Sequence, residues 1–180
     1  MEHNSNIPPR YNINDYNQWQ GDSELINGYP YAMSPSPFPK HQFVTKQFVF
    51  AFESAFRQNK TSCPCSVYFE LDWVVNDETI VRPDLMVLSE PINPNDFIRN
   101  PPILIVEVFS AATRLKDRNL KFNLYQQYGV KYYLMADPDA KTIEAFELVN
   151  NQYAQVNGLL QFVLTKNCTI TLEEERIFEA

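Results

Sequence analysis

The stretch that decides the fold spans residues 81–121 and reads VRPDLMVLSEPINPNDFIRNPPILIVEVFSAATRLKDRNLK. It places Asp84 in one apolar strand pattern and Glu107 in the next, and a charged helical pattern that carries Lys121 follows. An acid inside an apolar strand is costly to bury, because desolvation penalises its charged form unless a cation or strong donors compensate. Two such acids in consecutive strands therefore suggest a shared compensator, for which a divalent metal ion is the obvious candidate.

The rest of the chain predicts the scaffold around these acids. Helix, strands, helix and strands follow one another, which indicates an α/β (α+β) fold with a mixed central β-sheet and helices on its faces. The sequence shows no repeats or linkers, so we expect one domain over residues 1–180, with residues 1–12 as a flexible arm. Asn27-Gly28 predicts an N-terminal β-hairpin, and Asn150-Asn151 predicts a C-terminal one.

Apolar periodicity predicts the larger elements between the hairpins. Phenylalanines at helical spacing favour an amphipathic helix over residues 40–58. Segments rich in Val, Tyr, Phe and Trp favour two strands, one over residues 65–77 and one over residues 79–89. A second long helix is expected over residues 113–129, and a short helical turn near the N-terminus is expected to be capped by Asn14.

The charge balance limits the partners. A formal net charge of −7 counts against the broad basic face that normally attracts nucleic acid. Clustered metal-binding acids contribute to that charge, so binding of DNA through a local basic strip stays open. No apolar run approaches the roughly 20 residues that span a bilayer, so no membrane partner is expected. The strip would comprise the basic residues that cluster in sequence around the two acids: Arg82, Arg99, Arg114, Lys116, Arg118, Lys121 and Lys131.

The cysteines indicate a compartment rather than a function. Three cysteines, an odd number, argue against a disulfide framework and for a reducing, cytoplasmic setting. Cys63, Cys65 and Cys168 could suggest zinc, but Cys-Pro-Cys lacks the two-residue spacing of a zinc knuckle and a fourth ligand is missing. We therefore expect structural or solvent-exposed thiols at these positions.

Three motifs together resemble a known family. RPDLMVLS, ILIVEVFSAATRLKD with the lysine of RNLKFNLY, and GVKYYLMADP are similar to the Uma-two family of restriction endonucleases. That family belongs to the PD-(D/E)XK, or restriction-endonuclease-like, superfamily, and the similarity covers nearly the whole chain. The resemblance implies an endonuclease that depends on Mg²⁺ (or Mn²⁺) and hydrolyses phosphodiester bonds in DNA. Proteins of this superfamily often work as dimers, so a homodimer is a further expectation.

The resemblance also implies the residues of the site. Asp84 and Glu107 are the metal ligands, and the carbonyl of Val108 is a third. The superfamily usually has a lysine two residues after the glutamate, where this chain has Phe109, and the resemblance implies that Lys121 in the following helix replaces it. Such a lysine would orient the attacking water and neutralise charge in the transition state.

Three more residues are candidates, each with an alternative. Asp117 lies one helical turn before Lys121 and could support it, or the two could form a solvated surface pair. Glu24 matches a recurrent third carboxylate of the family, or is an ordinary surface acid. His41 opens the long helix, either as an acid/base group that supports the metal ligands or as a capping residue.

Functions from different classes fit these residues. The first is the Mg²⁺-dependent endonuclease. The second is a catalytically inactive nuclease-fold binding or assembly module, which Phe109 and the acidic balance favour. A metal-dependent hydrolase of a small phosphorylated substrate is a third alternative.

Overall fold

A six-stranded mixed sheet forms the centre of the protein, with its strands in the order β10-β9-β8-β7-β6-β3. β7 (Leu104–Val108) and β8 (Tyr132–Asp137) run parallel, and all other neighbours in this sheet run antiparallel. The computed structural model describes residues 8–33, 38–58, 63–110 and 114–179. The other strands of the sheet are β3 (Ser66–Phe69), β6 (Leu85–Leu88), β9 (Thr142–Val149) and β10 (Gln152–Gln155).

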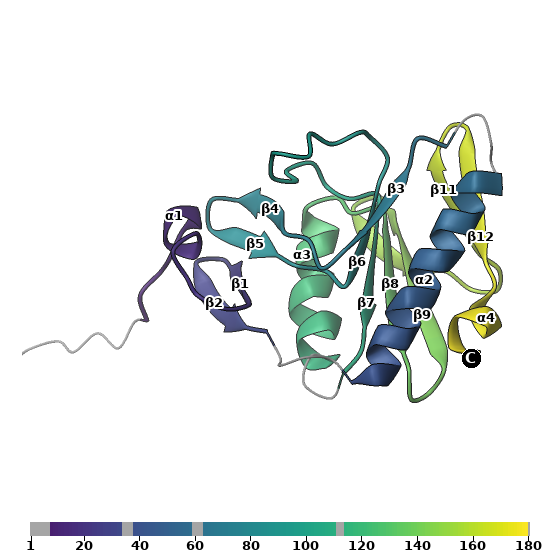
Figure 1. Ribbon diagram of the computed structural model, residues 1–180, viewed down its shortest axis with the longest axis horizontal. Helices are drawn as coiled ribbons and strands as arrows, with labels where there is room; N and C mark the ends of the chain where they lie inside the picture. Colours follow the sequence, from purple (N-terminus) through teal and green to yellow (C-terminus); the bar gives the residue numbers. More distant parts are fainter. Residues whose placement is uncertain (1–7, 34–37, 59–62, 111–113, 180) are drawn as a thin grey trace, which may run out of the picture.

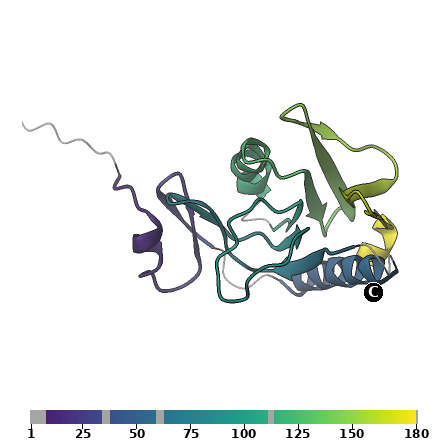
Figure 2. The ribbon, with the colours of Figure 1, turned by 90° about the horizontal axis from the view of Figure 1, so that it is seen from above.

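Helices cover both faces of this sheet, which confirms the predicted fold class (Figures 1 and 2). Side chains alternate between the faces along a strand. Every second residue of β7 from Leu104 joins the core that contains α2 (Pro39–Gln58). Ile105 joins the core on the opposite face, which contains α3 (Phe122–Gln127). Glu107 lies two residues after Ile105, so its side chain also points to the face that α3 covers.

α2 is amphipathic, as the spacing of its phenylalanines predicted. Phe48, Phe52 and Phe56 recur every fourth residue, are buried, and stack with ring centroids 6.1 and 6.2 Å apart. They pack in one core with residues of the central sheet, and this packing fixes the place of His41 near the start of the helix. Across the described residues, no helix combines the length and the apolar character needed to cross a membrane.

A second sheet, β2-β1-β5-β4, forms the N-terminal side of the molecule (Figure 1). Asn27 and Gly28 both have positive φ, 53° and 81°, and they join two antiparallel strands, so the predicted hairpin is confirmed. The strands are β1 (Ser23–Ile26), β2 (Tyr29–Ala32), β4 (Trp73–Asn76) and β5 (Thr79–Val81).

The chain before this sheet contacts the hairpin turn. The backbone N–H of Tyr11 donates to the carbonyl of Gly28 at 2.8 Å, and Arg10 forms an ion pair with Glu78. Glycine suits position 28 because its φ of 81° would strain any other side chain, and a Cβ there would also displace Arg10 Nε, which would lie 2.9 Å away. Residues 1–7 of the expected arm lie outside the described residues.

The short helix α1 (Ile13–Tyr16) begins earlier than expected. The Asn12 side chain accepts from the N–H of Asn14 at 2.8 Å, and Asp15 accepts from the N–H of Asn12 at 2.9 Å. These reciprocal bonds form a capping box. The expectation that Asn14 caps this helix is therefore wrong.

Two segments predicted as single strands are each divided between the two sheets. Residues 65–77 form β3 and β4, and between them Glu70 has a positive φ of 49°. Residues 79–89 form β5 and β6, and Pro83 lies between them. The prediction failed because apolar composition reports burial but not the sheet in which a residue is buried. Asp84 consequently lies directly before β6 rather than inside a strand.

The second long helix begins with π-helical turns. η1 (Lys116–Lys121) continues into α3, and both Asp117 and Lys121 are buried. Wider π-helical turns are frequent at functional sites. Thr113, the first residue expected in this helix, lies outside the described residues.

Two hairpins and a short helix form the C-terminal part. Asn150 and Asn151, with φ of 51° and 62°, join β9 to β10, so the predicted C-terminal hairpin is confirmed. The remaining elements are β11 (Leu160–Thr165), β12 (Cys168–Leu172) and α4 (Glu174–Phe178).

A disulfide joins Cys63 to Cys168, whereas Cys65 is a buried free thiol. The expectation of free thiols was therefore wrong for Cys63 and Cys168. Sequence spacing gave no signal, because the fold brings together two Cα atoms that are 105 positions apart and leaves them 4.8 Å from each other.

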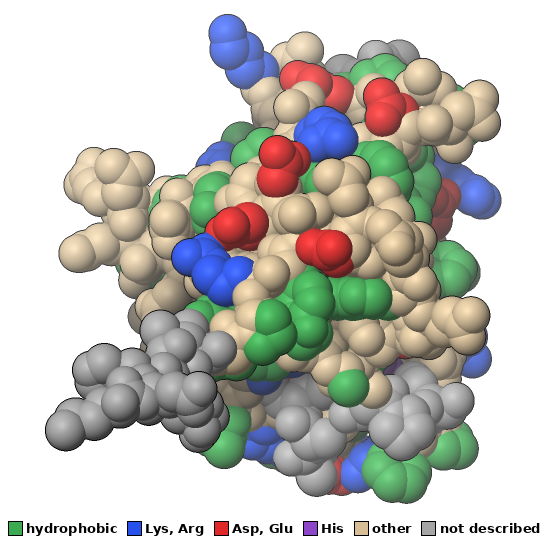
Figure 3. Space-filling view, turned by 90° about the vertical axis from the view of Figure 1, so that its left-hand side faces the viewer, with side chains coloured by type: hydrophobic (Ala, Val, Ile, Leu, Met, Phe, Trp, Pro, Cys, Tyr) green, Lys and Arg blue, Asp and Glu red, His purple; other side chains and the backbone are tan. Residues whose placement is uncertain are grey.

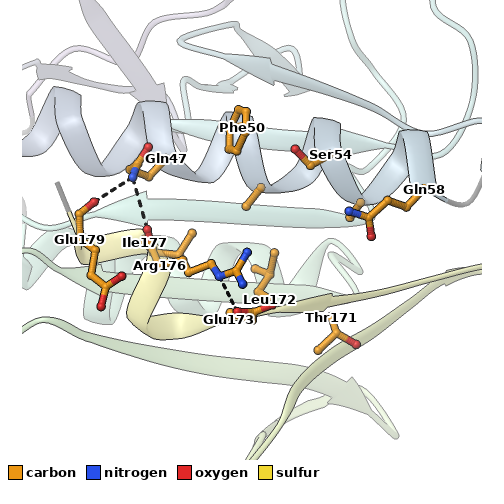
Figure 4. A pocket seen from close by; sticks show the side chains of 12 residues that line it. Gln47, Phe50, Ser54, Gln58, Thr171, Leu172, Glu173, Arg176, Ile177 and Glu179 are labelled. Atoms are coloured by element: carbon orange, nitrogen blue, oxygen red, sulfur yellow. Dashed lines mark hydrogen bonds and ion pairs between the residues drawn. The ribbon is translucent and has the colours of Figure 1, made fainter.

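A groove of about 580 Å³ lies between α2 and the C-terminal segment (Figure 4). At one end Gln47 Nε2 donates to the carbonyls of Arg176 and Glu179 at 3.3 and 2.9 Å. None of the residues that line this groove is a predicted site residue.

Candidate metal centre

Lys121 lies at the centre of a buried cluster of acids. Its Nζ atom is 2.8 Å from Glu107 Oε1, 2.9 Å from Glu24 Oε1 and 3.9 Å from Asp117 Oδ1. Lys121 is 3% exposed, Glu24 0% and Glu107 2%. The fold thus brings β1, β7 and η1 together at one group of charges. This burial excludes the alternatives of a solvated Asp117–Lys121 pair and of a surface acid at position 24.

Asp84 lies beside this cluster. Its Oδ2 accepts from the N–H of Val108 at 2.7 Å and lies 3.2 Å from His41 Nε2. Its backbone N lies 3.4 Å from Glu107 Oε2. The N–H of the next residue, Phe109, bonds to β8. Because successive residues of a strand direct their backbone groups to opposite neighbours, Val108 directs its carbonyl toward the side of Asp84.

Two buried tyrosines hold Glu107 and the π-helix in place. The hydroxyl of Tyr125 donates to Glu107 Oε1 at 2.7 Å, and the hydroxyl of Tyr133 donates to the carbonyl of Asp117 at 3.2 Å. The two rings contact edge to face, with centroids 5.0 Å apart. The orientation of the Glu107 carboxylate is therefore fixed by both Lys121 and Tyr125.

The acids share the positive charge of Lys121 unequally. Burial would raise the pKa of Glu24, but Lys121 and Lys116 outweigh burial and lower it. Burial raises the pKa of Glu107 to about 8, since the opposing effect of Lys121 is smaller and the neighbouring acids add repulsion. Burial would lower the pKa of Lys121, but the surrounding acids raise it well above its ordinary value. Glu107 is therefore the acid whose negative charge the lysines compensate less than that of Glu24.

His41 interacts with Asp84 through one ring nitrogen. Burial would lower the pKa of His41, but the hydrogen bond to Asp84, the charge of Asp84 and the backbone of Val108 raise it. Because a carboxylate only accepts hydrogen bonds, Nε2 carries the proton in this contact. Nδ1 is buried and has no hydrogen-bond partner among the described residues. His41 thus orients Asp84 from the start of α2.

The donor set fits a hard divalent ion. Three carboxylates pair with two lysines and a fourth lies beside them, so the fully ionised group carries a formal charge of −2. A divalent cation balances that charge, and carboxylate and carbonyl oxygens are the ligands that Mg²⁺ and Mn²⁺ prefer. The carboxylates belong to Glu24, Asp84, Glu107 and Asp117, and the lysines are Lys116 and Lys121.

Phe109 occupies the position two residues after Glu107, where the superfamily usually has a lysine. It is buried, and the guanidinium groups of Arg114 and Arg118 lie 4.9 and 5.1 Å from the centroid of its ring. A lysine at position 109 would lie on the same face of β7 as Glu107. In this chain Lys121 reaches that carboxylate from η1 instead.

Acids neutralise most of the predicted basic strip. Figure 3 shows that basic and acidic side chains are interspersed on the N-terminal side of the molecule. The strip therefore offers nucleic acid less net charge than its sequence indicated. Its ion pairs are Arg82 with Asp22 and Asp72, Arg114 with Asp137, Lys116 with Glu24, Arg118 with Glu144, and Lys121 within the cluster.

Sequence reasoning missed the roles of Lys116 and Tyr125. Lys116 Nζ lies 2.6 Å from Glu24 Oε2, so the wide turns of η1 bring this lysine to the same carboxylate as Lys121. Its position five residues before Lys121 matches the i→i+5 hydrogen-bond spacing of a π-helix, but only the structure reveals that helix type. Tyr125 fits an apolar helix face and carried no separate signal.

The fold and the acid cluster define a class of protein. A mixed central sheet covered by helices on both faces, with additional antiparallel sheets, is a nuclease-type fold. A crystal structure of "a putative nuclease belonging to DUF820" from Anabaena variabilis has a similar fold, with a TM-score of 0.73 and 16% sequence identity over 93% of this chain and 97% of that chain.

The family follows from the sequence comparison. The model of the Uma2 family, described as "Putative restriction endonuclease", matches residues 13–174, so the chain belongs to this family. It is the Uma-two family that the motifs resembled. The comparison with curated proteins found no match. The family supports a nuclease, and restriction-endonuclease-like proteins generally use divalent metal ions.

Proposed function

We propose that this protein is a divalent-metal-dependent endonuclease that hydrolyses phosphodiester bonds in DNA. The observation that carries the proposal is that Glu107 pairs with the buried ammonium group of Lys121 and also lies beside Asp84, whose backbone N is 3.4 Å from Glu107 Oε2. Membership of the Uma2 family supports the choice of a nuclease over other hydrolases.

Asp84, Glu107 and the carbonyl of Val108 would hold the ion, Mg²⁺ or Mn²⁺. When bound, the ion supplies a Lewis acid for a phosphoryl oxygen and lowers the pKa of a bound water molecule. His41 keeps the Asp84 carboxylate oriented through Nε2, and Tyr125 does the same for Glu107 through its hydroxyl. Both residues thereby limit the reorganisation that binding requires.

Lys121 is the proposed catalytic cation. Its ammonium group is held between Glu24 and Glu107, at the position where it can donate to the attacking water or to a phosphoryl oxygen. Lys116 also pairs with Glu24, so the ion pair between Lys121 and Glu24 is weaker than it would be without Lys116. Asp117 contributes a further negative charge that keeps Lys121 protonated.

A plasmid nicking assay tests this function. Wild-type protein should nick supercoiled DNA with Mg²⁺ or Mn²⁺ and stop when EDTA is added. Asp84→Asn and Lys121→Met should each lower the rate about 100-fold or more, because the first removes a charged ligand of the metal ion and the second removes the cation that would stabilise the reacting phosphate. Asp77→Asn is the matched control, because Asp77 is an exposed acid outside the cluster. Equal background nicking by all four proteins would refute the proposal.

A catalytically inactive binding or assembly module is the second candidate. The favouring observation is that Lys121 is 3% exposed and paired with acids, while Phe109 fills the usual lysine position. In that case the cluster only stabilises the fold. Absence of metal-stimulated nicking by a folded wild-type protein, with DNA or protein binding unchanged in Asp84→Asn, would favour this module.

The proposal extends to the working state of the protein. We infer that the chain is a single domain that acts as a homodimer, since two copies would present two sites to the two strands of DNA. We also infer a cytoplasmic location, which a DNA substrate favours. Light scattering on the purified protein measures the first property, and a mass of one chain at working concentration contradicts it. Fractionation of cells measures the second.

A further inference from the structure

Three cysteines cluster where the C-terminal hairpin meets the chain after α2. Cys63 and Cys65 lie between α2 and β3, and Cys168 is the first residue of β12. Their Sγ atoms all lie within 4.8 Å of one another. In the part of the chain that the structure describes, no other three His, Cys, Asp or Glu side chains are arranged to share one ion, since the candidate Mg²⁺ centre would use two carboxylates and a backbone carbonyl.

The three sulfur atoms are in different chemical states. Cys168, fully buried, forms the disulfide with Cys63, which is partly exposed. Cys65 is a buried free thiol, and burial raises its pKa. A protonated buried thiol is a poor nucleophile, so this placement does not favour rapid thiol–disulfide exchange. The disulfide alone leaves the third sulfur without a role.

We propose that reduction of the disulfide converts this cluster into a three-thiolate site for one soft metal ion, of which Zn²⁺ is the representative. Thiolates select soft or borderline ions over Mg²⁺. Three protein ligands leave a fourth position for water, and the partial exposure of Cys63 gives water access to that side. The site shares no residue with the carboxylate cluster.

The geometry requires only small movements. Zinc–sulfur bonds of about 2.3 Å place two thiolates on a tetrahedral ion about 3.8 Å apart. The Sγ atoms lie within 4.8 Å of one another, at most about 1 Å more than this value, and the two sulfurs of the reduced disulfide must move apart to reach it; rotation of cysteine side chains covers both changes. The metal-bound form would tie β12 to the α2–β3 connection, as the disulfide does in the oxidised form.

The chemistry balances in two steps. A dithiol reductant gives two electrons and two protons to the disulfide, becomes a disulfide itself, and leaves Cys63 and Cys168 as thiols. Binding of one Zn²⁺ to the three thiols then forms three metal–sulfur bonds and releases three protons, with no change in the oxidation state of sulfur. The metal stabilises thiolate over thiol, which offsets the raised pKa of Cys65.

Cobalt titration tests the proposal with a signal that reports sulfur ligands. The full chain is reduced anaerobically with a dithiol, freed of reductant, saturated with Mg²⁺ at the carboxylates, and titrated with Co²⁺. Thiolate-to-cobalt charge-transfer absorption should rise to one Co²⁺ per chain and disappear when Zn²⁺ is added. The oxidised protein should show no such band. Cys65→Ser, which retains both disulfide cysteines, should bind Co²⁺ more than about 100-fold more weakly.

Two outcomes overturn the proposal. The first is equal thiolate absorption in reduced wild type and in reduced Cys65→Ser. The second is absence of the absorption band in reduced wild type that retains its native circular dichroism spectrum. Reduction could itself unfold the chain, and then Zn²⁺ is added before the reductant. In that case Zn²⁺ must preserve the native circular dichroism spectrum of wild type but not that of Cys65→Ser. Equal unfolding of both proteins refutes the site. None of these results bears on nicking, so failure here is distinct from failure of the nuclease proposal.

Discussion

Substitution of Lys121 by methionine tests whether its charge holds the buried acids together. The ammonium group lies 2.8 Å from Glu107 Oε1 and 2.9 Å from Glu24 Oε1. Methionine keeps the length of the side chain but removes the charge. Glu24 then retains Lys116 at 2.6 Å, whereas Glu107 retains the Tyr125 hydroxyl and the backbone N–H of Asp84 but no cation among the contacts described above.

The expected loss of stability follows from these contacts. Removal of one partner of a buried ion pair costs about 3–5 kcal/mol, because it leaves an uncompensated buried charge. Glu107 can take up a proton instead, since its pKa already lies at about 8. We therefore expect the low end of the range, about 3 kcal/mol in the free energy of unfolding at pH 7. For a chain of this size that corresponds to a fall in Tm of about 6–12 °C.

Urea unfolding followed by circular dichroism measures the effect. Lys166→Met is the control, because Lys166 is exposed in the β11–β12 turn and should change stability by less than about 0.5 kcal/mol. The double variant Lys121→Met/Glu107→Gln should recover at least half of the loss, because it also removes the uncompensated acid. A loss below about 1 kcal/mol in Lys121→Met, or no recovery in the double variant, would show that Lys121 does not neutralise the buried acids.

Three further predictions follow from the same contacts. The pKa of Glu107 is raised from 4.5 to about 8, so the metal-free protein in EDTA should lose stability as pH rises from 5 to 8. Urea unfolding measures this slope, and Glu107→Gln should flatten it. A stability that rises with pH contradicts the assignment. Tyr125→Phe leaves a buried oxygen of Glu107 without this hydrogen bond and should cost about 1–3 kcal/mol by the same measurement, whereas no change would mean that Glu107 does not depend on it. The Cys63–Cys168 disulfide closes a sequence separation of 105, so its reduction without metal should cost about 4–5 kcal/mol in calorimetry, and an unchanged Tm would contradict this estimate.

The sequence predicted that Glu107 is buried, for a physical reason. Glu107 lies in an apolar run that has no solvated face, so its side chain needed a polar partner wherever the strand was placed. The period of two along β7 also assigns Glu107 and Phe109 to one face. Lys121 was inferred from the family resemblance, and the structure places its Nζ atom at that carboxylate.

Other features could not be read from the sequence. The division of residues 65–77 and 79–89 between two sheets depends on long-range pairing, which local composition does not encode. The same holds for the disulfide, whose cysteines approach through the fold. The π-helical turns of η1 accompany buried contacts such as the hydrogen bond from the hydroxyl of Tyr133 to the carbonyl of Asp117. A hydrophobic pattern with helical spacing does not distinguish π-helical from α-helical turns.

Binding of Mn²⁺ by the purified, metal-free protein tests the central claim most directly. Electron paramagnetic resonance of free Mn²⁺ during a titration at pH 8, with the disulfide intact, counts the ions that the carboxylates hold. We expect one ion per chain for wild type and for Asp77→Asn, and loss of that ion in Asp84→Asn and in Glu107→Gln. Equal binding by all four proteins, or no binding by wild type, would contradict the assignment of Asp84 and Glu107 as a metal centre.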